Sequence, residues 1–229
     1  MISVIIPTLN ESETIGILVS HLLKYTGKDL AEVIVSDAGS TDDTREKAVA
    51  AGAVVIHSPE KGRAAQMNFG ASKAVSDTLY FVHADCFPPA SFTKDIEQAI
   101  REGYGFGRFR TKFDSKKTIL KINAFVTRFN LFICYGGDQT LFITKNLFEK
   151  INGFSGEMRI MEDYDIVVRA KQSGRYKIIQ KDVLVSARKY LTNSWLTVQR
   201  ANYRIVQMYK KGYSQTEMAE KYKQSLNYR

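Results

Sequence analysis

Short apolar runs alternate with helical patterns along the first hundred residues, and this alternation constrains the fold more than any other feature of the sequence. Four runs have the length and apolar content of buried strands: ISVIIP, EVIVSD, AVVIHS and TLYFVH. The segments between them carry helical spacing or helix start and stop signals, as in STDDTREKAVAAG, which opens on Ser/Thr/Asp caps and closes on Gly52. Strands that alternate with helices at this spacing predict an α/β fold with a doubly wound, mostly parallel sheet.

After Gly103 the alternation becomes looser, although strand and helix patterns continue. The stretch YGFGRFRTKF alternates like an edge strand with basic residues on one face, and EDYDIVVRAKQSG has the pattern of a helix that opens on two acidic residues. The last forty residues are mostly helical in pattern. We expect these elements to pack beside the first sheet, so that residues 1–229 form a single domain with two halves, 1–103 and 104–229.

The two halves differ in charge. Residues 1–103 carry 9 Lys and Arg against 14 Asp and Glu, whereas residues 104–229 carry 24 against 10. The basic half is therefore expected to meet an anionic partner. Nucleic acid is not expected, because the basic residues are scattered and no nucleic-acid-binding motif accompanies them. An anionic acceptor, a diphosphate or an anionic lipid surface explains the difference in charge between the halves at least as well as nucleic acid does.

Cysteine usage and hydropathy indicate where such a chain works. Cys86 and Cys134 fit a reducing compartment better than a disulfide scaffold. The stretch MISVIIPTLNE has the pattern of a strand and lacks the basic start and long apolar core of a signal peptide. The most apolar later segment, ILKINAFVTRFNLFICY, is interrupted by polar and charged residues and is not a membrane span. We expect a soluble, cytoplasmic protein whose contact with a membrane, if it makes one, is peripheral.

Polar residues gather where the four predicted strands end, at Pro7–Glu11, Asp37–Ser40, Ser58–Arg63 and His83–Asp85. The carboxyl ends of parallel strands meet at one edge of a sheet, and ligands bind in the crevice there. The four segments taken together therefore predict one ligand-binding crevice.

The first two strand ends have the chemistry of a nucleoside site. Thr8, Asn10 and Glu11 come just before a predicted helix, whose N-terminus favours anionic or polar ligands. Capping of that helix by Asn10 or Ser12 is the simpler alternative. Asp37 precedes the residues expected to cap the second helix, and it is expected to be free to accept hydrogen bonds from a nucleobase imide or a ribose hydroxyl.

Phosphate binding requires a different signal. No GxxxxGK[ST] loop is present, which excludes a P-loop enzyme, and no GxGxxG follows the first strand, which argues against a dinucleotide-binding domain. Lys61 and Arg63 instead flank Gly62 at a helix start, where they would grip a diphosphate or simply form a solvated basic loop. A divalent cation on Asp85 would stabilise the charge of a diphosphate leaving group, with His83 assisting or only shaping the turn.

The segments Pro7-Thr8-Leu9-Asn10-Glu11, Asp37-Ala38-Gly39-Ser40-Thr41-Asp42 and His83-Ala84-Asp85 resemble the P-x-x-N-E, D-G-S-x-D-like and D-x-D-like segments of glycosyltransferase family 2, which has the GT-A fold. The resemblance implies that residues 1–103 bind a nucleoside-diphosphate sugar of UDP or GDP type. It implies that Asp85 coordinates Mg²⁺ or Mn²⁺, although His83 replaces the first aspartate. It also implies that Thr8, Glu11 and Asp37 contact the nucleoside. Together with the residues at the other strand ends, the expected donor-binding residues are Pro7, Thr8, Asn10, Glu11, Asp37, Lys61, Arg63 and Asp85. The segments GRAAQMNFGA, HAD, GGDQ and SAR resemble a small bacterial subgroup associated with radical-enzyme and arsenosugar gene clusters.

A second acidic pair, Glu162 and Asp163, opens a predicted helix, where negative charge is favourable in any case. The resemblance implies more: Asp163 is the base that deprotonates an acceptor hydroxyl in an inverting transfer, and Glu162 orients it or binds the acceptor. Asp138 and Gln139 are candidates for the acceptor or donor-sugar pocket, or else form a turn. Arg188 is a candidate for the diphosphate, or else a solvated strand end.

Two other functions compete with an inverting glycosyltransferase. A nucleotidyltransferase usually needs a glycine-rich, basic loop after the first strand, where this chain has PTLNESET. A non-catalytic module that binds nucleotide or anionic glycan has no need of the Glu162–Asp163 pair. Several tyrosines near the C-terminus mix with Lys and Arg and either pack as ordinary amphipathic helices or face a membrane interface or a dimer partner. They are Tyr203, Tyr209, Tyr213, Tyr222 and Tyr228.

Overall fold

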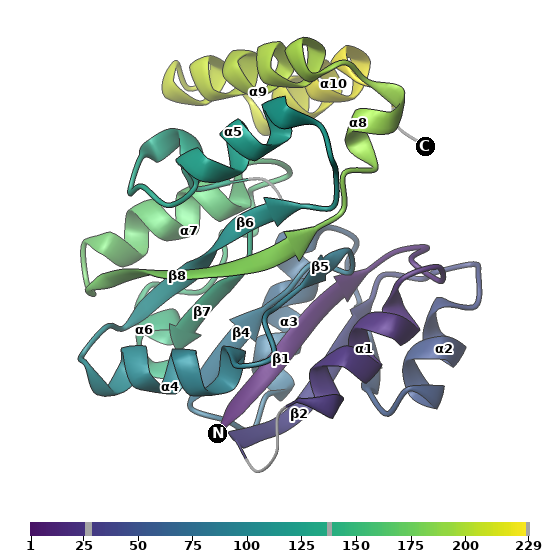
Figure 1. The fold of residues 1–229 in the computed structure, drawn as a ribbon, viewed down its shortest axis with the longest axis vertical. Coiled ribbons are helices and arrows are strands. Elements are labelled where there is room, and N and C mark those ends of the chain that lie inside the picture. Colours follow the sequence, from purple (N-terminus) through teal and green to yellow (C-terminus); the bar gives the residue numbers. More distant parts are fainter. Residues whose placement is uncertain (26–28, 137–138, 228–229) are drawn as a thin grey trace.

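The structure is a computed structural model that describes residues 1–25, 29–136 and 139–227 (Figure 1). Its strands are β1 Ile2–Thr8, β2 Leu30–Asp37, β3 Val54–His57, β4 Thr78–Phe81, β5 Cys86–Phe87, β6 Phe106–Phe113, β7 Leu141–Thr144 and β8 Tyr176–Val185. Its α-helices are α1 Ile15–Lys24, α2 Thr44–Ala50, α3 Arg63–Lys73, α4 Phe92–Arg101, α5 Thr118–Val126, α6 Lys145–Lys150, α7 Glu162–Lys171, α8 Lys189–Thr192, α9 Trp195–Lys210 and α10 Gln215–Ser225. A 3₁₀ turn spans Phe132–Cys134.

One sheet runs through both halves of the chain in the order β3-β2-β1-β4-β7-β6-β8-β5. Within the described residues, four strand pairings are parallel and three are antiparallel. The parallel group β3, β2, β1 and β4 comes from the alternating first hundred residues, whereas β7 enters antiparallel beside β4. The predicted α/β class with a doubly wound, mostly parallel sheet is confirmed.

The central strand β1 is buried along its whole length because helices cover both faces of the sheet. Ile2, Val4 and Ile6 pack into a cluster with the apolar stripe of α1, whereas Ile5 points to the opposite face and packs with α3. This stripe has the helical spacing of one face and is fully buried; it consists of Ile15, Leu18, Val19 and Leu22. On the α3 face, a Cβ atom on Gly70 would lie only 2.5 Å from Ile5, so this glycine allows the helix to approach the strand closely.

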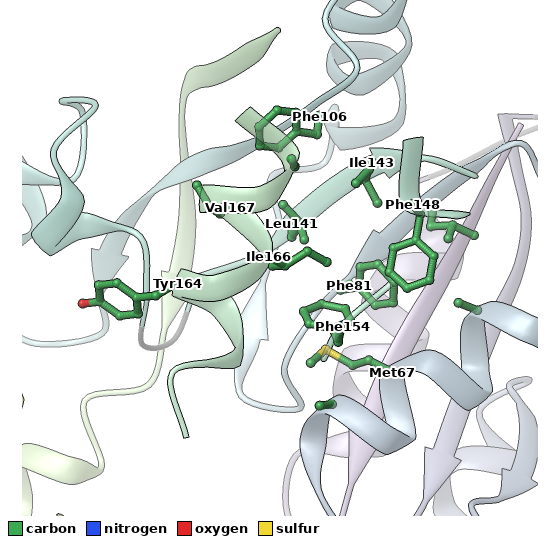
Figure 2. Close-up of a cluster of buried hydrophobic side chains, with 14 of the residues drawn as sticks. Met67, Phe81, Phe106, Leu141, Ile143, Phe148, Phe154, Tyr164, Ile166 and Val167 are labelled. Atoms are coloured by element: carbon green, nitrogen blue, oxygen red, sulfur yellow. The ribbon is translucent and has the colours of Figure 1, made fainter. Parts of the chain in front are cut away.

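The hydrophobic cluster on the α3 face of the sheet joins the two halves of the chain. Met67 of α3 and Phe81 of β4 pack with Phe154, which precedes α7, and with Ile166 of α7 (Figure 2). The rings of Phe81 and Phe154 meet edge to face at 5.0 Å. Because α7 is anchored in this cluster, its first turn lies at a defined place relative to the parallel strands.

The prediction that YGFGRFRTKF forms an edge strand is wrong, because β6 lies between β7 and β8. Gly107 permits this close approach: a Cβ atom there would lie 2.2 Å from the carbonyl oxygen of Lys177 in β8. Arg108, one of the basic residues of the alternating pattern, is only 2% exposed. It donates hydrogen bonds to the Tyr176 hydroxyl at 2.8 Å and to the Phe129 carbonyl at 3.3 Å. The basic side of the strand is therefore packed at Arg108, half-buried at Arg110 and exposed only at Lys112.

The C-terminal residues are mostly helical, as predicted, and α9 and α10 lie together with α5 and α8 at one end of the molecule (Figure 1). Tyr209 and Tyr222 pack against the core, so ordinary helix packing accounts for them. Tyr203 and Tyr213 are exposed, and Tyr228 lies outside the described residues. Among the helices of the described residues, none combines the length and the apolar character needed to cross a membrane.

Candidate functional site

The ends of the parallel strands meet at one edge of the sheet, as predicted from their order in the sequence. Thr8 at the end of β1 pairs in register with Asp37 at the end of β2, and Asp37 pairs with His57 at the end of β3. His83 and Asp85 follow β4, which lies on the other side of β1. The four predicted segments are therefore brought to one edge of the sheet.

Asp37 is completely buried at this edge. Its Oδ1 accepts hydrogen bonds from the hydroxyls of Thr8 and Ser40. Its Oδ2 accepts from the backbone N–H groups of Gly39 at 3.0 Å and Ser40 at 2.9 Å. A carboxylate has about four lone-pair sites, so the chain itself occupies all of them. The expectation that Asp37 is free to accept from a nucleobase is therefore wrong for this arrangement.

The ionisation of Asp37 follows from these contacts. Burial by itself would raise the pKa of the carboxyl group, but the hydrogen bonds from Ser40, Gly39 and Thr8 together lower the pKa below its ordinary value. The side chain consequently acts as an ionised anchor that fixes the turn after β2 against the end of β1.

Asn10 and Ser12 do not cap α1, because the cap position is Thr14. Asn10 has a φ of 57° and accepts hydrogen bonds from the backbone and hydroxyl of Thr41. It therefore ties the loop after β1 to the loop after β2. Asp42 continues this tie by accepting from the backbone N–H group of Ser12 at 3.2 Å.

Asp42 also organises the start of α2, although the cap position is Asp43 rather than one of the predicted cap residues. It accepts hydrogen bonds from the hydroxyl and the backbone N–H group of Thr44. The pKa of Asp42 is lowered to about 2, mainly by the hydrogen bond from the Thr44 hydroxyl. Negative charge is thus held just before the helix N-terminus, where it is favourable.

Gln66 is a buried residue of this edge that was not predicted from the sequence. It is 4% exposed, and its side-chain amide donates to the backbone carbonyls of Thr8 at 2.7 Å and Ser36 at 2.8 Å. It therefore links α3 to the ends of β1 and β2. The available signal was its place beside Met67 in α3, where a polar residue shares the buried side of the helix with Ala64 and Met67.

Arg188 lies between two carboxylates of the predicted donor site. It donates two hydrogen bonds of 2.8 Å to Glu11, and its Nε lies 3.2 Å from Oδ2 of Asp85. The backbone supports this arrangement, because the N–H group of Ser186 donates to the carbonyl of Asp85 at 3.1 Å. Arg188, predicted to bind the diphosphate, is thus in contact with Glu11 and Asp85, predicted to bind the donor, although these residues are far apart in the sequence.

The acidic pair opens α7 and faces the donor half of the chain. Glu162 is 3% exposed, and its Oε1 lies 3.0 Å from Nε of Arg63 at the start of α3, an ion-pair distance without hydrogen-bond alignment. The side chain of Asp163 is 16% exposed, and its Oδ2 lies 3.9 Å from Nε2 of His83. Carboxylates, a guanidinium and an imidazole from both halves therefore converge at the strand ends.

The remaining predicted residues lie as follows. Pro7 is buried within β1, and Lys61 is exposed in the loop before α3. Gln139 is 9% exposed, and its Oε1 has no hydrogen-bond partner among the described residues. It lines a small pocket together with Asp163 and the buried Arg108, which the sequence analysis had not singled out as a site residue. Asp138 lies outside the described residues.

A second hollow lies elsewhere. A groove of about 470 Å³ runs between α9 and α10, where Arg204, Met208, Lys211 and Lys221 line it. None of the strand-end residues contributes to its lining. We therefore assign the candidate site to the strand ends, because the convergent charged and polar groups are there.

The residues present fit a divalent cation that is shared with a bound diphosphate. Among the described residues, no group of three or more His, Cys, Asp and Glu side chains could enclose a metal ion. Mg²⁺ however is commonly held by one or two carboxylates together with substrate phosphates. Asp85 offers such a carboxylate, and the guanidinium of Arg188 already places a positive charge against it.

Comparisons with known proteins agree with this geometry. The sequence profile described as "Glycosyl transferase family 2" matches residues 3–164. Glucosyl-3-phosphoglycerate synthase of Mycolicibacterium smegmatis is 35% identical over 96 residues, which cover 38% of this chain and 32% of that protein. An uncharacterized glycosyltransferase of Haemophilus influenzae is 25% identical over 193 residues, 75% of this chain and 62% of that protein. The chain thus spans about a third of the synthase it matches.

Solved structures share the fold. Glucosyl-3-phosphoglycerate synthase from Mycobacterium tuberculosis, in complex with Mn²⁺, UDP and phosphoglyceric acid, has a TM-score of 0.66 at 19% identity and covers 93% of this chain and 79% of that chain. The mannosyltransferase PcManGT from Pyrobaculum calidifontis, in complex with GDP-Man and Mn²⁺, has a TM-score of 0.67 at 17% identity and covers 89% and 61%. At such identities the likeness establishes the fold, which is GT-A.

Proposed function

The chain belongs to glycosyl transferase family 2, and on that premise we propose that it moves a sugar from a nucleoside-diphosphate donor of UDP or GDP type to an acceptor hydroxyl, with inversion at the anomeric carbon. The observation that carries the proposal is the approach of Asp163 to the strand ends. Its carboxylate lies 3.9 Å from the imidazole of His83, which follows β4. A base opposite the leaving group is what distinguishes a transferase from a module that only binds nucleotide.

Asp163 serves as the general base in this proposal. It is partly accessible at the N-terminus of α7, so an acceptor hydroxyl can reach it. As the acceptor oxygen attacks the anomeric carbon, Asp163 takes the hydroxyl proton and the bond to the diphosphate breaks with its electron pair on the leaving oxygen. Glu162, held beside Arg63, orients this end of the helix or binds the acceptor.

The charge that develops on the diphosphate needs compensation. Arg188, Lys61 and Arg63 are the basic residues proposed to supply it. A divalent cation, Mg²⁺ or Mn²⁺, would when bound contribute the same kind of charge stabilisation as a Lewis acid. Asp85 and the diphosphate would hold this ion, with His83 beside them.

The nucleoside end is proposed to lie at the ends of β1 and β2. Pro7, Thr8 and Asn10 shape this part of the crevice, and Glu11 offers a carboxylate once Arg188 turns toward the diphosphate. Because the carboxylate of Asp37 is fully used by the chain, its proposed role is to hold Thr8 and the following turn in place. Gln139 is proposed to line the acceptor or donor-sugar pocket, and Asp138 is proposed with it from the sequence alone.

Several finer assignments belong to the same proposal. We propose that residues 1–229 act as one domain, with a donor-binding half over 1–103 and an acceptor-side half over 104–229. We propose that the protein is cytoplasmic and that any membrane contact it makes is peripheral; the sequence left a homodimer open as a further partner. The resemblance to the subgroup of radical-enzyme and arsenosugar gene clusters rests on the sequence segments alone.

A donor screen tests the function. Release of nucleoside diphosphate from UDP- and GDP-sugars is measured with Mn²⁺, with Mg²⁺ and with chelator, first without and then with candidate acceptors. The proposal expects slow hydrolysis of one donor class that the correct acceptor accelerates. Pyrophosphate release from a nucleoside triphosphate and a sugar phosphate would instead indicate a nucleotidyltransferase. Tight nucleotide binding without turnover of any donor would indicate a binding module.

A further inference from the structure

Apolar side chains remain exposed along α5 and the segment that follows it, at the end of the molecule where α8 and α9 lie (Figure 1). Their exposed fractions run from 36% at Ile119 to 61% at Ile133. We call this group the α5 surface; its members are Ile119, Ile122, Phe125, Phe129, Leu131 and Ile133. Single exposed apolar residues are ordinary, but a run of six within fifteen positions marks an interaction surface.

The α5 surface is not the core-facing side of the helix. Leu120 makes that contact: it is 1% exposed and packs with Val198 and Ala201 of α9. Ile119, Ile122 and Phe125 follow one another at three-residue spacing, so they share the other side of the helix. Helix α5 therefore presents apolar residues on two sides, of which the fold covers one.

The chain segment that carries the α5 surface contains charges of a single sign. Residues 115–136 contain four basic residues, Lys116, Lys117, Lys121 and Arg128, and no acidic residue. The guanidinium carbon of Arg128 lies 3.8 Å from the ring centre of Phe125. The ring of Phe125 in turn meets that of Phe129 edge to face at 5.9 Å. Cations on apolar stems beside aromatic rings are typical of surfaces that rest in the headgroup region of a bilayer.

We propose that the α5 surface docks the protein peripherally onto an anionic lipid bilayer. The apolar side chains enter the boundary between headgroups and acyl chains, and the basic side chains contact lipid phosphates. A second copy of the chain fits less well. A two-fold contact would bring each basic surface against its own copy, and like charges across an interface are costly.

The α5 surface is joined directly to the candidate base. The hydroxyl of Tyr164, the residue after Asp163, donates a hydrogen bond of 3.1 Å to the carbonyl of Ile133. The rings of Phe132 and Tyr164 lie 5.2 Å apart. Docking through Ile133 would therefore hold the start of α7 close to the lipid–water interface, where an acceptor attached to a lipid would present its hydroxyl.

Vesicle sedimentation of the full chain tests the proposal without any donor or turnover, so its outcome is independent of the proposed transferase activity. The probes are phosphatidylcholine vesicles with and without phosphatidylglycerol. We expect binding to the anionic vesicles that weakens with added salt, and binding at least tenfold weaker to phosphatidylcholine alone. Equal binding to both vesicles, or no binding to either, would overturn the proposal.

Two matched pairs of variants locate the contact. Ile122→Ser/Phe125→Ser should weaken anionic-vesicle binding at least tenfold, whereas Val49→Ser/Val75→Ser, at exposed apolar positions of the donor half, should leave it unchanged. Lys116→Gln/Lys121→Gln should weaken binding to anionic vesicles several-fold, whereas the control Lys47→Gln/Lys73→Gln should leave this binding unchanged. Equal losses within either pair would overturn the location. Light scattering of the same proteins tests whether a second copy of the chain covers the α5 surface instead. The result that would assign the surface to a second copy is a dimer that does not bind vesicles and that Ile122→Ser/Phe125→Ser dissociates.

Discussion

Arg188 donates two hydrogen bonds of 2.8 Å to the carboxylate of Glu11, which lies 177 residues earlier in the chain. The same guanidinium approaches Asp85, so one side chain from beyond β8 contacts two carboxylates of the donor edge and offsets part of their negative charge. The side chain of Arg188 is 53% exposed, whereas those of Glu11 and Asp85 are 19% and 12% exposed, so solvent reaches and screens the pair from the arginine side. A bound diphosphate would attract Arg188, and its cation would replace the positive charge beside Asp85.

The first prediction concerns the cation. Binding of UDP or GDP should strengthen when Mn²⁺ or Mg²⁺ is present, and Asp85→Ala should abolish this dependence, because Asp85 supplies the carboxylate that the ion shares with the diphosphate. Calorimetric titration with and without chelator measures both. Asp114→Ala, an exposed carboxylate far along the sequence, is the control and should keep the metal dependence. Metal-independent binding of equal strength in the parent protein contradicts the role given to Asp85.

The second prediction concerns Arg188. Arg188→Ala should lower turnover on the order of tenfold or more, because a charge-assisted contact to the leaving diphosphate is lost. The free energy of unfolding without ligand should change by about 1 kcal/mol, since the arginine side of the ion pair is open to solvent. Arg188→Lys should restore part of the turnover. A large loss of stability with unchanged turnover would make Arg188 a structural residue only.

The parallel half of the fold was predictable because its signals are local. Each buried strand and each apolar stripe, such as Ile15 and Leu18 of α1, is specified by spacing within a few residues. The place of β6 was not predictable in this way. Its partner β8 lies about seventy residues later, and nothing in YGFGRFRTKF states that a further strand will cover that side.

The site was predictable to the same extent. Topology alone brings the strand ends together, so the crevice followed from the order of strands and helices. The hydrogen bonds of Asp37 could not be predicted in this way. Two of their donors are backbone N–H groups of the turn that follows Asp37, and the geometry of this turn is fixed only when the chain folds. The contact between Glu11 and Arg188 depends on the path of the chain after β8, for which the sequence carries no signal.

The third prediction follows from the buried carboxylate of Asp37. Asp37→Asn should lower the free energy of unfolding at neutral pH by about 3 kcal/mol, because hydrogen bonds to a charged group are replaced by poorer ones or left unmade. Chemical denaturation measures the change. Asp114→Asn, an exposed position, should be nearly neutral. An unchanged stability of Asp37→Asn would remove the anchoring role.

The fourth prediction is the pH dependence that Asp37 and Asp42 impose. Both carboxyl groups have a lowered pKa in the folded chain, Asp42 to about 2, against an ordinary value of 3.8. A carboxyl group with a depressed folded pKa binds protons more readily when unfolded, so its stabilisation is complete above pH 3.8 and is lost as the pH falls toward the folded pKa. Unfolding measured from pH 6 to pH 2.5 should show this loss. In Asp37→Asn the slope should be shallower than in the parent, and an identical slope would contradict the assignment.

The last prediction concerns the base, because it separates an enzyme from a binding protein. Asp163→Asn keeps the size of the side chain and can still accept a hydrogen bond, but it cannot take the acceptor proton. Turnover should fall on the order of a hundredfold or more, the usual contribution of general base catalysis. Donor affinity should stay nearly the same, because the proposed nucleotide contacts lie at the strand ends of the first hundred residues.

Asp165→Asn is the matched control for this variant. Asp165 lies in the first turn of the same helix, but its carboxylate accepts hydrogen bonds from Arg169, one turn further along that helix. Turnover should therefore survive Asp165→Asn even if the helix loses some stability. Nucleotide titration and product formation are measured on all three proteins. Loss of donor binding in Asp163→Asn would give this residue a structural or donor-side role. Unchanged turnover would place the base elsewhere, and Glu162 and Asp138 would be the next residues to substitute.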